Sequence, residues 1–289
     1  MKICLFCGNR FNSSDWQCPS CHTAPHKING FIAFAPELAQ KNDGFNVADF
    51  AKLAPLEANN FWFRTRNKII IWALGKYFPN MNSFFEIGCG TGYVLSGIEQ
   101  AFPSLNLSAS DLHTSGLRFA NDRVIRSSLF QMDARQIPFD EEFDVIGAFD
   151  VLEHIADDEK VLAEIYRAVR LGGGAIFTVP QHEFLWSQAD IQACHERRYS
   201  TVELIRKVEE VGFNIEMSTS FLFLLLPLMM LSRLFQRDKN STHDQLAELK
   251  VGGFTNLILE KVLDIERLMI RLGFRLPAGG SRLLIARKI

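Results

Sequence analysis

The chain has 289 residues, of which 47% are hydrophobic and 22% are charged, so it can bury a large core. Its formal net charge of −2 provides no overall attraction to nucleic acid or to anionic lipid. The first residues, MKICLFCGNR, lack the apolar core of a signal peptide. We therefore expect a cytoplasmic protein whose cysteines stay reduced, so that metal binding is favoured over disulfides.

Two cysteine pairs lie close together at the start of the chain. Cys4-x-x-Cys7 and Cys18-x-x-Cys21 can each form a tight knuckle, in which two thiolates converge on one ion. Four thiolates form a closed tetrahedral site, which is typical of structural Zn²⁺. Residues 1–30 are therefore predicted to form a zinc ribbon, and they resemble ribbons of the rubredoxin-knuckle type. The alternative is four free thiols in a disordered tail, since so short a segment buries little core without metal.

Residues 31–60 are mixed in composition, and we expect a linker with short helices. Residues 61–289 then alternate between helical and strand-like segments. Strands are expected at 83–88, 105–111, 127–132, 143–149, 174–180, about 214–224 and the final SRLLIARKI, and helices at 61–77, 92–102, 114–123, 157–170, 201–211 and within 240–270. This alternation predicts an α/β domain with a mostly parallel sheet covered by helices on both faces. Ligands of such sheets bind at the carboxyl ends of the strands.

A glycine-rich turn follows the first of these strands, in the sequence FFEIGCGTGYVL. Gly88, Gly90 and Gly92 give the spacing G-x-G-x-G, whereas a dinucleotide fold uses G-x-G-x-x-G to place a pyrophosphate at a helix N-terminus. The carboxylate of Glu86 disfavours a diphosphate and favours a cationic ligand. S-adenosylmethionine carries a sulfonium and an ammonium group, and glycines allow the backbone to approach it closely.

This E-x-G-x-G-x-G pattern resembles motif I of class I S-adenosylmethionine-dependent methyltransferases of the type 11/12 kind, and further motifs follow in order over about residues 60–215. The resemblance implies a Rossmann-like, seven-stranded sheet. It also implies that Asp111 holds the ribose and that Asp133 binds the adenine amino group, although Asp111 could instead cap a helix. The predicted cofactor-binding residues are Glu86, Gly88, Cys89, Gly90, Gly92, Asp111, Leu112, Asp133, Ala134 and Asp150.

The acceptor side is expected in the long segment VPQHEFLWSQADIQACHERRYS and near the end of the fourth strand, because loops of this length are often functional. Candidates for a catalytic base are His154, His182 and His195. Candidates for substrate binding are Trp186, Arg197, Arg198 and Tyr199. The two arginines could bind an anionic acceptor or could anchor the loop to acidic neighbours. The segment resembles a bacterial subgroup of methyltransferases often assigned to surface polysaccharide, lipid or secondary metabolism.

The most apolar stretch is 217–232, which is shorter than the roughly 20 residues that a transmembrane helix needs. Pro227 also interrupts it. We expect the core strand at about 214–224 to run into a buried helix, within a helical, apolar insertion at about 222–275. The alternative is an apolar lid near a greasy substrate, which is compatible with peripheral membrane contact.

Three functions follow from these patterns. The favoured one is methylation of a small-molecule or lipid/glycan-linked acceptor, with the ribbon as a stabilising or docking module. The second is RNA methylation, because zinc ribbons precede a similar domain in ribosomal RNA guanine methyltransferases and Phe6, Phe11 or Trp16 could stack on bases. The third is a non-catalytic scaffold that binds the cofactor and a protein partner.

Overall fold

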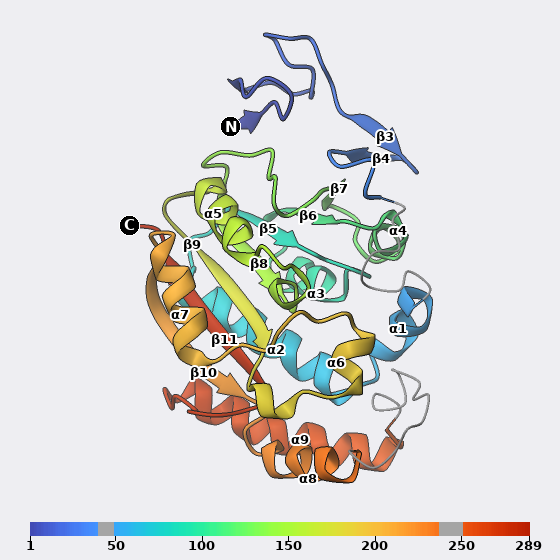
Figure 1. Cartoon of the computed structure of the whole chain (residues 1–289), viewed down its shortest axis with the longest axis vertical. Helices are drawn as coiled ribbons and strands as arrows, with labels where there is room; N and C mark the ends of the chain where they lie inside the picture. Colours follow the sequence, from blue (N-terminus) through green and yellow to red (C-terminus); the bar gives the residue numbers. More distant parts are fainter. Residues whose placement is uncertain (40–48, 237–250) are drawn as a thin grey trace.

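In the residues that the structure describes, 1–39, 49–236 and 251–289, nine strands form one central sheet (Figure 1). This computed structural model has the strand order β10-β11-β9-β8-β5-β6-β7-β4-β3. The strands from β9 to β7 run parallel, and β11 and β10 are antiparallel to their neighbours. The predicted strands correspond to β5 Ser83–Ile87, β6 Asn106–Asp111, β7 Ser128–Gln131, β8 Phe143–Phe149, β9 Val169–Pro180, β10 Asn214–Phe221 and β11 Ser281–Arg287.

Helices cover both faces of the sheet, which confirms the predicted α/β architecture (Figure 1). Successive side chains of a strand point to opposite faces, so in β5 Phe84 joins one apolar cluster and Phe85 joins the other. Both faces of β5 are therefore buried, which explains its unbroken apolar run. The helices are α1 Asp49–Glu57, α2 Phe61–Tyr77, α3 Tyr93–Ala101, α4 Thr114–Arg123, α5 Asp158–Ala168, α6 Gln188–Gln192, α7 Thr201–Glu210, α8 Leu226–Gln236 and α9 Gly253–Arg271, with 3₁₀ turns η1 Leu152–His154 and η2 Glu183–Leu185.

The sheet is two strands wider than the predicted seven, because the N-terminal region contributes β3 His26–Ile28 and β4 Phe31–Ala33. β4 lies in the segment that the sequence assigns to a linker, yet it pairs in parallel with β7. A run of only three residues carries too weak a pattern to identify such an edge strand. Of the remaining linker, α1 is helical, whereas residues 40–48 lie outside the described residues.

The ribbon packs against this edge of the sheet. It contains the short hairpin β1 Lys2–Ile3 and β2 Arg10–Phe11. The Trp16 ring lies 4.6 Å from the Phe34 ring, 5.4 Å from that of Phe139 and 5.9 Å from that of Phe130, between ring centres. These edge-to-face contacts continue the apolar core of the large domain into the ribbon.

The apolar stretch 217–232 divides between β10 and α8. β10 lies in the core, as predicted, and ends at Phe221. α8 is not a buried helix, because Leu228 is 55% exposed and Met230 is 47% exposed. The predicted insertion continues through residues 237–250, which lie outside the described residues. Among the described helices, none combines the length and the apolarity that crossing a bilayer requires.

Candidate functional site

The glycine-rich turn connects β5 to α3, at the carboxyl end of the central strand. Gly88, Gly90 and Gly92 all have positive φ values, of 67°, 52° and 75°. A Cβ atom on Gly88 would lie 2.5 Å from a methyl group of Val151, and one on Gly92 would lie 2.8 Å from Cα of Ala120. Both the backbone conformation and the packing therefore require glycine at these two positions. Gly88 and Gly90 remain partly exposed, so a ligand can approach this backbone closely.

Asp111 fixes this turn from the neighbouring strand β6. Its Oδ2 accepts a hydrogen bond of 2.8 Å from Gly90 N, and its Oδ1 accepts one of 2.8 Å from His113 N. The side chain is buried, and burial raises the pKa of Asp111, whereas the hydrogen bonds from His113 and Gly90 oppose that rise. Each oxygen keeps a second lone pair, so the carboxylate can still accept a bond from a ribose hydroxyl.

A carboxylate beneath the turn has one oxygen without a hydrogen-bond partner among the described residues. Glu86 is 2% exposed, and its Oε2 atom has no hydrogen-bond partner among the described residues. Burial raises the pKa of Glu86 to about 8, although the charge of Arg66 on α2 opposes the shift. Arg66 forms an ion pair with Asp150 and lies 4.5 Å from the ring centre of Trp62. A cationic ligand near the turn would reduce the cost of burying the Glu86 charge.

The short helix α1 is bonded to the outer side of the same turn. Both carboxylate oxygens of Glu57 lie 2.7 Å from the Thr91 hydroxyl, which donates to them. Arg123 on α4 donates to Glu57 and to Thr91, and its Nη2 donates to the carbonyl of Ala54 over 2.6 Å. The helix thus adds to the walls of a site whose base is the glycine turn.

The remaining predicted cofactor residues lie at the ends of β6, β7 and β8. Asp133 is half-buried and pairs with Arg135 two residues later, at 2.8 Å. Asp150 has a φ of 55°, a strained conformation for a residue other than glycine. Cys89 is buried, which agrees with a small packing residue, and burial raises the pKa of its thiol. Leu112 is half-buried and Ala134 is buried.

A second cluster of polar side chains lies just beyond Asp150. Glu153 and His154 belong to η1, and His195 follows α6 in the long loop after β9. One ligand atom from each of these three residues lies within 4.8 Å of the others. The rings of His154 and His195 are 4.7 Å apart between centres and almost perpendicular, at 78°. Two of the three histidines predicted as catalytic are therefore brought together.

The carboxylate of Glu153 is the most deeply buried group of this cluster. Glu153 is 0% exposed, and neither of its carboxylate oxygens has a hydrogen-bond partner among the described residues. Burial, and then the charge of Asp150, raise the pKa of Glu153 well above its usual value. Burial and the neighbouring His195 lower the pKa of His154 to about 4, so its imidazole is neutral at pH 7.

Asp190 orients His195. Its Oδ1 lies 2.9 Å from Nδ1 of His195, and Arg198 holds the same carboxylate at 2.8 and 3.1 Å. Ser187 N also donates to Asp190 over 2.8 Å, as part of the capping box of α6. Burial opposes ionisation of Asp190, but the bond from His195 and the charge of Arg198 outweigh it and lower its pKa to about 2.

The predicted substrate-binding residues have mostly intramolecular partners. Arg198 is held by Asp190, and Arg197 pairs with Asp158 at 2.9 Å. Tyr199 is 0% exposed and its hydroxyl donates to Asp158 over 2.5 Å, so burial prevents it from touching a substrate. Of the two roles open to the arginines, the geometry favours anchoring the loop. Trp186 is half-buried and follows η2.

The third candidate base, His182, lies apart from the other two histidines. It has a φ of 66° and stacks on Phe184, with 4.9 Å between ring centres. Its Nε2 atom is buried without a partner among the described residues. Burial and the charges of Arg282 and Arg198 lower the pKa of His182.

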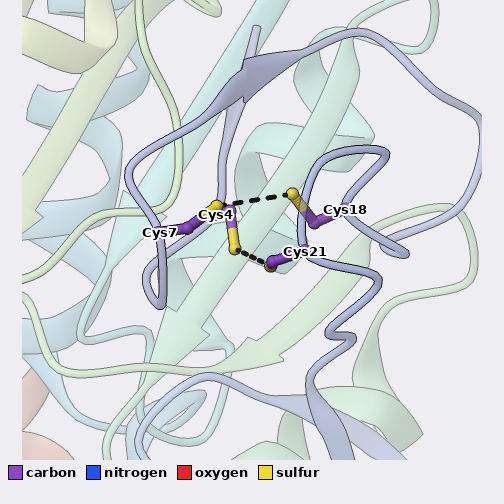
Figure 2. A group of neighbouring side chains, drawn as sticks. All are labelled: Cys4, Cys7, Cys18 and Cys21. Atoms are coloured by element: carbon purple, nitrogen blue, oxygen red, sulfur yellow. Dashed lines mark hydrogen bonds between the residues drawn. The ribbon is translucent and has the colours of Figure 1, made fainter.

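The four cysteines of the ribbon converge on one point (Figure 2). Sγ of Cys4 lies 3.6 Å from Sγ of Cys21, and Sγ of Cys7 lies 3.6 Å from that of Cys18. All four sulfur atoms lie within 4.8 Å of one another. A tetrahedral zinc ion with Zn–S bonds of about 2.3 Å places its sulfur ligands roughly 3.8 Å apart, so the arrangement is compatible with a zinc site.

Three residues of these sites were not predicted from the sequence. Arg66 pairs with Asp150, Glu57 binds Thr91, and Glu153 belongs to the histidine cluster. Arg66 is four residues from Trp62, so helical spacing could have linked the two. Glu153 adjoins His154, but a glutamate at the start of a helix is ordinarily a solvated residue.

A family model described as "Methyltransferase domain" matches residues 85–177. A probable S-adenosylmethionine-dependent methyltransferase of Mycolicibacterium smegmatis is 25% identical over 164 residues, which cover 56% of this chain and 62% of that protein. The malonyl-[acyl-carrier protein] O-methyltransferase of Bacillus cereus is 28% identical over 116 residues, covering 39% of this chain and 43% of its relative. The matched region of this chain thus spans less than two thirds of either relative's length.

Among solved structures, an S-adenosylmethionine-dependent methyltransferase of Thermotoga maritima, described as a possible histamine N-methyltransferase, has a similar fold. The TM-score is 0.53 at 14% identity, and the alignment covers 84% of this chain and 96% of that one. At this identity the likeness concerns the fold alone.

Proposed function

Since residues 85–177 match a methyltransferase domain and the chain is similar to S-adenosylmethionine-dependent methyltransferases, we propose that it transfers the methyl group of S-adenosylmethionine to a small-molecule or lipid-linked acceptor. One observation carries this proposal. A glycine turn that tolerates no Cβ at Gly88 or Gly92 lies above the buried carboxylate of Glu86, whose Oε2 atom has no partner among the described residues. A cationic ligand that approaches the backbone closely satisfies both features, and S-adenosylmethionine is such a ligand.

The residues that would hold the cofactor come from successive strand ends. Gly88, Gly90 and Gly92 would contact its amino-acid part, and Asp111 would accept hydrogen bonds from the ribose hydroxyls. Asp133 would bind the adenine, after exchanging its bond to Arg135 for one to the amino group. When bound, the sulfonium supplies an electrophilic methyl group, so the protein has mainly to align the acceptor and exclude water.

The acceptor is proposed to bind near the histidine cluster and the loop after β9. His154 and His195 lie at the carboxyl edge of the sheet. In the loop after β9, the side chain of Phe184 is 56% exposed and offers an apolar contact to an acceptor. A matched relative acts on a malonyl-[acyl-carrier protein], and another is named a 2-methyl-6-phytyl-1,4-hydroquinone methyltransferase. Both names describe carrier-linked or lipid-like acceptors, and that chemistry suits the apolar surface of α8.

The ribbon is proposed to hold structural Zn²⁺ and to stabilise the edge of the sheet. Of the three rings considered for stacking on RNA bases, Phe6 is 80% exposed and stays available. Phe11 is 7% exposed and Trp16 packs against three phenylalanines, so neither of these two rings is free to stack. A cleft of about 700 Å³ lies between the ribbon and α5, and its arginines are paired with carboxylates: Arg10 with Asp140, Arg135 with Asp133, and Arg167 with Glu164. These contacts therefore favour a ribbon that stabilises the edge of the sheet over a ribbon that recognises RNA.

Zinc analysis tests the proposed role of the ribbon. Substituting Cys18→Ser should remove one zinc per chain, because three thiolates hold the ion much more weakly than four. Cys89→Ser, at a buried cysteine of the glycine turn, is the matched control and should leave the zinc content unchanged. Equal zinc content in both variants would contradict a site formed by the four cysteines.

The function itself is tested by incubating the protein with methyl-labelled S-adenosylmethionine and an extract of its source cells. The label is then separated into organic-soluble, RNA and protein fractions. We expect label in the organic-soluble or small-molecule fraction, and none with Gly90→Arg. Label in a ribonuclease-sensitive fraction would instead favour RNA as the acceptor, and absence of transfer would favour a cofactor-binding scaffold.

A further inference from the structure

We propose that Glu153, His154 and His195 form a second metal site, which binds a divalent transition cation beside the acceptor. This site is separate from the four cysteines of the ribbon. One donor atom from each residue lies within 4.8 Å of the other two, although His195 is more than 40 residues from Glu153 along the chain. Small movements of the side chains would bring the three donors to the roughly 2.0–2.2 Å at which nitrogen and oxygen bind such ions.

Unpartnered donor atoms provide independent support. Both carboxylate oxygens of Glu153 are buried without a hydrogen-bond partner among the described residues, and so is Nδ1 of His154. A buried carboxylate that is neither paired nor hydrogen-bonded is costly to ionise, and a bound cation offsets that cost. A bound cation would satisfy all three atoms at once.

The orientation of His195 also fits a ligand. Asp190 binds its Nδ1 at 2.9 Å, which leaves Nε2 as the free ring nitrogen. A carboxylate on the far nitrogen is the usual support of a metal-binding histidine, because it fixes the tautomer and the ring. Arg198 and Ser187 in turn hold Asp190 in place. The groups that orient His195 are therefore already in place around it.

The local charges accommodate a cation. The carboxylates of Asp150, Glu153 and Asp190 lie close to the guanidinium groups of Arg66 and Arg198. With all five groups ionised, the three carboxylates and two guanidinium groups carry a net charge of −1, which attracts a cation. Two imidazoles and one carboxylate are donors that favour Zn²⁺, Fe²⁺ or Mn²⁺ over Mg²⁺ or Ca²⁺.

Three protein ligands leave coordination positions open, in contrast with the closed site of four cysteines. The side chain of His195 is 15% exposed, so the cluster can be reached from solvent. The role of the ion rests on the proposed function. An acceptor hydroxyl bound to the cation would lose its proton to water more readily. Its oxygen lone pair would then form the bond to the methyl carbon, while the S–CH₃ electron pair stays on sulfur and leaves S-adenosylhomocysteine.

Manganese binding tests the site without relying on activity. The full-length protein, with its ribbon metal retained, is titrated with Mn²⁺, and free Mn²⁺ is followed by electron paramagnetic resonance. Thiolate sites do not favour Mn²⁺, so the titration reports on nitrogen and oxygen donors. We expect one Mn²⁺ per chain, displaced by added Zn²⁺. Glu153→Gln and His195→Ala should weaken binding at least tenfold, whereas the exposed Glu159→Gln and His26→Ala should not change it.

S-adenosylmethionine affinity, measured on the same variants, shows that they are folded, because the cofactor binds at a different set of residues. No bound Mn²⁺ in the wild type, or equal binding in Glu153→Gln and His195→Ala, would overturn the proposal. Methyl transfer that proceeds fully in the presence of a chelator would overturn the role of the ion in the reaction. Mn²⁺ binding without any methyl transfer would leave the metal site standing and contradict the proposed function.

Discussion

The glycine turn and the histidine cluster lie at the same edge of the sheet, but their polar groups are satisfied to different degrees. In the turn, Asp111 receives hydrogen bonds from two backbone N–H groups, so the loop is fixed before any ligand arrives. In the cluster, Glu153 and one nitrogen of His154 have no partner within the described residues. The comparison suggests that the cofactor side is preorganised by the backbone, whereas the acceptor side is completed by what binds there.

Gly92→Ala should produce the largest loss on the cofactor side. The new Cβ would lie 2.8 Å from the backbone of Ala120, at a φ of 75°. A displacement of the turn that costs about 3 kcal/mol lowers S-adenosylmethionine affinity roughly 100-fold. Calorimetric titration measures the change.

The matched control is Gly172→Ala, which shares a positive φ of 80° but has nothing within 4 Å of its Cβ. It should bind S-adenosylmethionine as the wild type does. A preorganised turn would be contradicted if Gly92→Ala kept its affinity, or if both variants lost it equally.

Asp190→Asn should affect the acceptor side alone. The substitution weakens the bond that orients His195 and should lower methyl transfer about 10–100-fold, as is usual for a carboxylate that supports a ligand histidine. Mn²⁺ affinity should fall in parallel, whereas S-adenosylmethionine affinity should stay constant. Asp157→Asn, an exposed carboxylate next to α5, is the control. A parallel loss of cofactor affinity would mean that Asp190 has only a structural role.

The pH dependence of stability should report on the buried carboxylate beneath the turn. The pKa of Glu86 is raised from 4.5 to about 8, so the folded protein retains a proton that the unfolded chain releases between these values. The contribution of Glu86 to stability therefore falls as pH rises from about 4.5 to 8, at up to about 1.4 kcal/mol per pH unit, and changes little above that range. Glu86→Gln should lack this contribution, which urea unfolding of both proteins at several pH values would reveal.

Bound S-adenosylmethionine should oppose this effect, because its positive charges favour the ionised carboxylate. The affinity of the wild type relative to Glu86→Gln should therefore increase as pH rises toward 8. A pH-independent difference between the two proteins would show that Glu86 does not sense the cofactor.

The sequence predicted the features that depend on local patterns. The spacing of Gly88, Gly90 and Gly92 after an apolar strand located the turn, and the end of the next strand located Asp111. The structure confirms the mostly parallel sheet with helices on both faces, because alternating strands and helices restrict the topology. Four clustered cysteines likewise indicated a common site, and their sulfur atoms do converge.

Features formed by distant residues were not predictable in this way. β4 pairs with β7 across nearly a hundred residues, and no periodicity marks so short a strand. The long loop after β9 was noted, but nothing in its sequence showed that Asp190 would take both His195 and Arg198 as partners. Glu153 was missed because its role depends on burial beside a loop that follows it by about 40 residues.

Calorimetric titration with S-adenosylmethionine tests the central claim most directly. The wild type and Asp122→Asn, an exposed aspartate on α4, should each bind one molecule per chain. Asp111→Asn should bind at least about tenfold more weakly, since an amide cannot accept from Gly90, His113 and a ribose hydroxyl together. No binding by the wild type, or equal affinity in Asp111→Asn, would contradict a cofactor site at the glycine turn.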